Sequence, residues 1–167
     1  MDLIPVLVLF AHIGAATTWI GGLAYVRFIL LPALTRAAPT VRGPVFVDLG
    51  PRTVRFLLRS GEITIVAGLA NFFLMGGMEK ARVAHLWAGS IGLGFLGALA
   101  IYIIGQAVTG PTTMRITDII RFVVAGSAPP DAPAQLEALG QKQRQMLNIQ
   151  LGIGIAVTFL MAVARFS

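Results

Sequence analysis

Four long runs of apolar residues, separated by short polar segments, organise this chain. They cover about Leu3–Leu34, Val54–Met78, Ala84–Thr109 and Met146–Phe166. A run of about 20 apolar residues is long enough to cross the hydrocarbon core of a bilayer as a helix. Helices are required there because lipid offers no hydrogen-bond partners to the backbone. The pattern therefore predicts an all-α integral membrane protein, with residues 1–167 forming one domain, a four-helix bundle.

Composition and charge indicate how this bundle lies in the membrane. Hydrophobic residues make up 56% of the 167 residues, more than soluble domains contain. Most of the basic residues behind the net charge of +6 gather in two connections, between spans one and two and between spans three and four. Because Lys and Arg concentrate on the cytoplasmic side, we expect both termini on the outer side of a multi-pass inner (plasma) membrane protein. The same distribution favours the lipid bilayer, and not nucleic acid, as the partner of these charges.

Two segments between the spans carry patterns of their own. The prolines of Thr35–Thr53 indicate an ordered loop or an interfacial stretch. Residues 113–125 have the pattern of a short amphipathic helix at the cytoplasmic interface, clearest over Met114–Val124. Breakers at Gly126–Pro133 then end that helix, and Asp131 can serve as the N-cap of a last helix that runs into span four.

The chain has two histidines and no cysteine, so imidazoles are its strongest candidate metal ligands. An ionisable side chain inside a membrane span is costly and marks a functional site by default. At a helical rise of about 1.5 Å per residue, His12 lies about 13 Å and His85 about 9 Å from the outer ends of their spans. The sequence therefore predicts two imidazoles at similar depth.

Small residues follow each histidine, which leaves room for a flat ligand between the helices. The two faces continue to Trp19 on span one and to Gly89 on span three, and Asn71 of span two reaches the same layer. Imidazole is the usual axial ligand of haem iron, so the pattern favours a haem b held by His12 and His85. Three cations at the outer ends of the spans could neutralise its propionates, namely Lys80, Arg82 and Arg165.

Two other interpretations of the same region stay open. Met75 and Met78 lie near His85 around the outer turn, and thioether and imidazole ligands suit copper. The chain would then be a copper-transport or copper-handling protein that uses these three residues and His12. Alternatively, the histidines only hydrogen-bond across helices, and the chain is a cofactor-free membrane anchor for a partner subunit.

Charged residues also lie inside the inner halves of the first two spans. Arg27 and Glu62 have matched depths, and opposite charges inside a membrane usually pair because an unpaired charge is expensive there. We therefore expect a buried ion pair between them. The alternative is a proton path or a substrate contact, helped by polar residues at the same level, namely Gln106, Asn148 and Gln150.

The string HIGAATTWIGGLAYVRFILLPAL, which begins at His12, joins a histidine to a W-x-G-G-L motif and a proline-bearing end. With Gly68 and Asn71 in the next span, it resembles the copper-resistance protein D family and the HemJ-type protoporphyrinogen oxidases. The resemblance covers span one well and span two loosely, and it implies a membrane fold of four or more helices with a functional histidine, here His12. In the HemJ-type group that histidine is tied to haem and porphyrinogen oxidation, and in the copper-resistance group to copper passage. Span three lacks the lysine that the HemJ-type group would use there, which argues against porphyrinogen oxidation.

These observations predict a haem-b-binding inner-membrane protein that acts in electron transfer or oxidoreduction. As a membrane haem oxidoreductase, it would take electrons from a quinone or a porphyrin-like substrate and pass them to an acceptor on the outer side. We also expect the chain to bind a redox partner or a second copy of itself.

Overall fold

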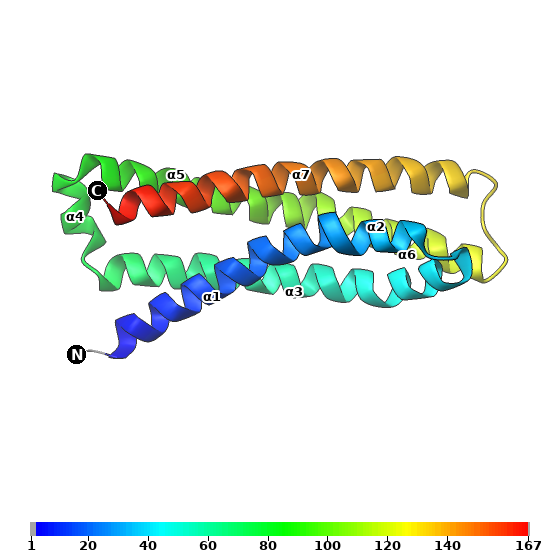
Figure 1. Ribbon diagram of the computed structural model, residues 1–167, viewed down its shortest axis with the longest axis horizontal. Coiled ribbons are helices and arrows are strands. Elements are labelled where there is room, and N and C mark those ends of the chain that lie inside the picture. Colours follow the sequence, from blue (N-terminus) through cyan, green and yellow to red (C-terminus); the bar gives the residue numbers. More distant parts are fainter. Residues whose placement is uncertain (1–2, 167) are drawn as a thin grey trace.

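The computed structural model describes residues 3–166, which form helices joined by short connections and contain no β-strand. Four long rods dominate the structure, and each is long and apolar enough to cross a membrane. This confirms the predicted all-α architecture with four helices able to cross a membrane (Figure 1). The first rod consists of α1 (Leu3–Tyr25), the π-helical turn η1 (Val26–Leu30) and α2 (Leu31–Arg36), and the second is α3 (Pro39–Leu74). The third rod consists of α5 (His85–Ile104), the π-helical turn η2 (Gly105–Thr109) and α6 (Gly110–Val124). The fourth rod is α7 (Ala132–Arg165).

Both ends of the described chain lie at the same end of the bundle, beside the short helix α4 (Gly77–Val83) (Figure 1). We call this end the terminal end. The connections at residues 37–38 and 125–131 lie at the opposite end, which we call the loop end. The first and third rods therefore run in one direction and the second and fourth rods in the other.

The rods are longer than a bilayer is thick. They contain 34 to 40 residues, which corresponds to about 50–60 Å at the rise of an α-helix. The hydrocarbon core of a bilayer is only about 30 Å thick. Each rod is therefore at least about 20 Å longer than the hydrocarbon core, and most charged residues lie in the loop-end half.

Helix α3 begins earlier than the sequence predicts. The expected loop or interfacial stretch Thr35–Thr53 is instead helical from Pro39 onward, with Pro44 and Pro51 inside the helix. A proline in a helix interior removes one backbone hydrogen bond and costs about 3 kcal/mol or more. Tertiary packing offsets this cost, because this part of α3 lies against α6, with Gly43 facing Ile120.

The segment expected to form an interfacial helix at residues 113–125 is part of the bundle. Helix α6 continues α5 through η2 and packs against both α3 and α7. Its buried face consists of Thr112, Thr113, Ile116, Thr117 and Ile119. The amphipathic pattern therefore marks a face that packs against other helices and not a helix lying on the membrane surface. Helix α7 begins at Ala132, directly after the predicted N-cap Asp131, although that side chain makes no capping hydrogen bond.

The rods pack as two antiparallel pairs. Helix α1 lies closely along α3 and α5 closely along α7, whereas α1 and α5 are diagonal, with no Cα atoms within 8 Å of each other in residues 3–166. Gly61 allows a close approach within the first pair, because a Cβ there would lie 2.8 Å from the indole of Trp19. The pairs meet in a central apolar cluster of Trp19, Leu23, Val26, Leu57, Ile101, Leu147 and Leu151.

Candidate functional site

His12 lies between α1 and α3. Its Nδ1 is 2.8 Å from the backbone carbonyl oxygen of Thr64, and its half-buried ring lies over Gly68. A carbonyl oxygen can only accept a hydrogen bond, so Nδ1 carries the proton and donates it. In the neutral ring Nε2 then keeps its lone pair. Because Gly68 has no side chain, the ring can approach the helix this closely, and a Cβ there would lie 2.7 Å from Cε1.

This arrangement is typical of a metal-ligating histidine. Such residues donate their second ring nitrogen to a backbone carbonyl or a carboxylate, which fixes the tautomer and orients the ligating nitrogen. His12 has the carbonyl partner and the free Nε2 that this role requires. The donor chemistry of His12 therefore fits one axial ligand of a haem iron.

Asn71 adds a polar atom to the same part of α3. It follows Gly68 by three residues and so lies on the same helix face. Its Oδ1 is buried and has no hydrogen-bond partner within residues 3–166. A buried carbonyl oxygen without a donor is costly, so this atom requires a donor that the described chain does not supply.

The structure does not bring His85 to His12. His85 is the first residue of α5 and is exposed, and α5 lies diagonally from α1. The face that continues from His85 is open, because a Cβ on Gly89 would meet no atom within 4 Å. The similar depth of His12 and His85 therefore does not make them neighbours, since His12 faces the second rod and not the third. The residues present do not fit a haem held between these two histidines.

Apart from Trp19, the other predicted ligand residues lie at or near the terminal end. Trp19 is only 3% exposed and packs against Gly61, so it belongs to the core. The ammonium group of Lys80 lies 4.7 Å from the centroid of the Trp87 ring, which is a cation–π contact. The remaining side chains, namely Met75, Met78, Arg82 and Arg165, are exposed.

Arg27 and Glu62 do not form the expected ion pair. Nε of Arg27 donates to Oδ1 of Asn148 on α7, 2.6 Å away. Glu62 accepts hydrogen bonds from Arg59 and from Tyr102, each at 2.8 Å. The two charges have similar depth but face different neighbours, because Arg27 points to the fourth rod and Glu62 to the third.

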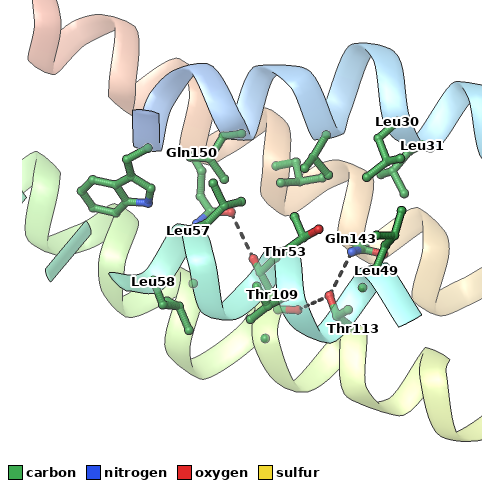
Figure 2. A pocket seen from close by; sticks show the side chains of 18 of the residues that line it. Leu30, Leu31, Leu49, Thr53, Leu57, Leu58, Thr109, Thr113, Gln143 and Gln150 are labelled. Carbon is green, nitrogen blue, oxygen red and sulfur yellow. Dashed lines mark hydrogen bonds between the residues drawn. The ribbon is translucent and has the colours of Figure 1, made fainter. Parts of the chain in front are cut away.

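A buried polar layer crosses the bundle between η2, α6 and α7, and sequence reasoning missed most of it. Gln150 donates to the carbonyl oxygen of Ile101 at 3.0 Å and accepts from the hydroxyl of Thr109 at 3.1 Å. Gln143 donates to the hydroxyl of Thr113 at 3.0 Å, and this hydroxyl donates to the carbonyl oxygen of Thr109 at 2.9 Å. Figure 2 shows the bonds of Gln150 to Thr109, of Thr113 to Thr109 and of Gln143 to Thr113 as one chain across the core. The seven-residue spacing of the two glutamines was the available signal, since it places both on one face of α7.

The polar layer borders a central cavity of about 50 Å³, lined by all four rods (Figure 2). Both π-helical turns contribute to its wall, and they lie at similar levels, η1 starting about 35 Å along the first rod and η2 about 30 Å along the third. π-Helical turns occur frequently at functional sites. The cavity is large enough for a few water molecules and too small for a macrocycle.

Comparison of the chain with protein-family models, with curated proteins and with solved structures finds no match. The functional argument therefore rests on the geometry of the described residues.

Proposed function

We propose that this chain is a haem-b-binding protein of the inner membrane that acts in electron transfer, with His12 as an axial ligand of the iron. The observation that carries the proposal is the hydrogen bond from Nδ1 of His12 to the carbonyl oxygen of Thr64, which leaves Nε2 available inside a membrane span.

His12 alone is a sufficient protein ligand for this role. Haem proteins with a single proximal histidine are common, so the exposed position of His85 does not argue against haem. Copper is less well supported, because thioether groups favour Cu(I) and both Met75 and Met78 are exposed at the terminal end. A haem group, when bound, supplies one-electron chemistry.

The chain's own residues would hold and tune that group. His12 binds the iron, and the Thr64 carbonyl fixes the ring and raises the basicity of Nε2. Gly68 provides the space for the ring, and Asn71 offers a hydrogen-bond acceptor beside it. The cations at the terminal end, Lys80, Arg82 and Arg165, are the candidates for neutralising propionates.

The orientation of the chain is part of the proposal. The arginine-rich loop end faces the cytoplasm, so the terminal end and both termini face outward. His12 then lies in the outer half of the membrane, where it can pass electrons from a membrane-dissolved reductant to an acceptor outside.

The test is the optical spectrum of protein purified from haem-replete cells. We expect a Soret band and a reducible α-band in the wild-type protein, and their loss in His12→Ala. His85→Ala is the matched control, because it removes an exposed imidazole that lies away from His12. This variant should keep both bands. Wild-type protein without haem, or a His12→Ala variant with an unchanged spectrum, would overturn the proposal. Colourless protein with bound copper would support the copper alternative.

A further inference from the structure

Four polar side chains form a linked group between α3 and α5, which we call the Glu62 cluster. Arg59 donates from Nη1 to Oε2 of Glu62, and Tyr102 donates from its hydroxyl to Oε1 of the same carboxylate, both at 2.8 Å. Nε2 of Gln106 donates to the Tyr102 hydroxyl oxygen, also at 2.8 Å. The cluster therefore joins two charged groups, a phenol and an amide in one hydrogen-bonded chain.

The cluster lies inside the membrane-spanning part of the bundle. Apolar residues precede it on α3 at residues 56–58 and follow it from residue 63. Glu62 is about 18 Å from the terminal end of α3 at the rise of an α-helix, so a hydrocarbon core about 30 Å thick that begins at that end encloses it.

The cluster also opens to the outside of the bundle. The side chain of Arg59 is 79% exposed and that of Glu62 is 34% exposed, and Gln106 is exposed as well. Their neighbour Ile63 is exposed too, so no protein covers this face, and an uncovered face of a membrane-spanning helix borders lipid. Charged residues in a membrane span normally face the protein interior or an aqueous cavity, and they mark functional sites. An ion pair that faces lipid is therefore unusual, and it indicates that a polar ligand binds there.

The unused hydrogen-bond donors and acceptors of the cluster define the chemistry of that ligand. The guanidinium group of Arg59 has further N–H donors, and the Glu62 carboxylate and the Gln106 carbonyl have further acceptor sites. The ligand must arrive through the lipid phase, must both accept and donate hydrogen bonds, and must carry an apolar tail. A phosphate headgroup does not suit this depth, and the carboxylate of Glu62 repels an anion. The central cavity cannot take such a ligand, because its volume is only about 50 Å³.

We propose that the Glu62 cluster binds the ring of a membrane-dissolved isoprenoid quinone or quinol. The ring oxygens accept hydrogen bonds from Arg59, and a quinol hydroxyl donates to Glu62 or Gln106, while the tail lies along the apolar surface of α3 and α5. This inference deepens the proposed function, on which it rests for its biological role, because it names a quinol as the electron donor. The binding itself does not depend on haem.

The experiment is photoaffinity labelling in nanodiscs of phosphatidylcholine with the quinol form of an azido-substituted ubiquinone, followed by mass spectrometry of the labelled peptides. We expect label on α3 and α5 near Glu62, removed by excess decylubiquinol. Glu62→Gln and Tyr102→Phe should each raise the concentration for half-maximal labelling roughly tenfold, as expected when a hydrogen bond to a charged group is lost. Gln106→Leu is the second variant if either of these fails to fold.

The chain offers two matched controls. Asp48→Asn breaks a similar ion pair on the same helix, where Arg52 lies 2.7 Å from Asp48, and Tyr25→Phe removes an exposed phenol from α1. Both should leave labelling unchanged. Equal labelling of wild type, Glu62→Gln and Tyr102→Phe would overturn the inference, as would displacement by phosphatidylglycerol and not by quinol. His12→Ala should lose haem and keep quinone labelling, so a failure of the haem proposal is visible separately from a failure of this one.

Discussion

The side chain of Gln150 on α7 donates a hydrogen bond of 3.0 Å to the backbone carbonyl oxygen of Ile101 on α5. This bond joins the fourth rod to the third, just before the π-helical turn η2 begins at Gly105. The same amide accepts from Thr109 within that turn, and Gln150 is 2% exposed. The polar layer therefore fastens α7 to the stretch of backbone where the third rod leaves regular α-helical geometry.

Replacing Gln150 with Leu should destabilise the bundle by about 1 kcal/mol, because the Ile101 carbonyl and the Thr109 hydroxyl lose their partner in a buried place. The measurement is reversible unfolding in detergent micelles, followed by circular dichroism. Gln145→Leu is the control, since Gln145 is an exposed glutamine on the same helix. Equal stability of the two variants would show that the polar layer does not hold the rods together.

The sequence predicts the rods well because membrane spans depend on the length and apolarity of a run, and both can be read directly. It predicts the start of α3 poorly, because Pro44 and Pro51 normally end a helix. In the structure α3 packs against α6 along that segment, and this contact joins residues far apart in the chain.

The candidate site shows a different limit. The depth of His12 can be counted from the helical rise, but its direction cannot, because α1 is apolar on all sides and no polar face marks the neighbour. The sequence therefore places His12 and His85 at one level without showing that α1 lies against α3 and not α5. The same limit explains the expected pairing of Arg27 with Glu62, which have different partners in the structure.

Arg27 and Glu62 should behave independently in a double-mutant cycle. Their partners lie on different rods, so the effects of Arg27→Met and Glu62→Gln on unfolding free energy should simply add. The pair Arg59→Met and Glu62→Gln should deviate from additivity, because these side chains are hydrogen-bonded to each other. A clear coupling between Arg27 and Glu62, with none between Arg59 and Glu62, would contradict the assigned partners.

The orientation in the membrane can be tested with single cysteines, because the chain has no cysteine of its own. Met78 lies in α4 at the terminal end and Ser127 in the connection at the loop end, and both are exposed. In intact cells, a membrane-impermeant maleimide should label Met78→Cys directly and Ser127→Cys only after permeabilisation. This outcome is expected because the basic residues gather at the loop end. The reverse pattern would place both termini in the cytoplasm and the His12 site in the inner half of the membrane.

Gly68 provides the most direct test of the His12 geometry. A methyl group in Gly68→Ala would lie 2.7 Å from Cε1 of His12, so the ring would have to leave its position over α3 and give up the hydrogen bond to Thr64. We expect the variant to lose about 1–3 kcal/mol of stability from overpacking and to bind less haem than the wild-type protein. Gly14→Ala is the matched control on α1, because a Cβ there meets no atom within 4 Å, and it should keep both stability and haem. Thermal unfolding and the reduced spectrum measure the two effects separately. If Gly68→Ala is destabilised but keeps the wild-type haem content and spectrum, the ring contact is only structural, and the iron ligand must be sought elsewhere than at His12.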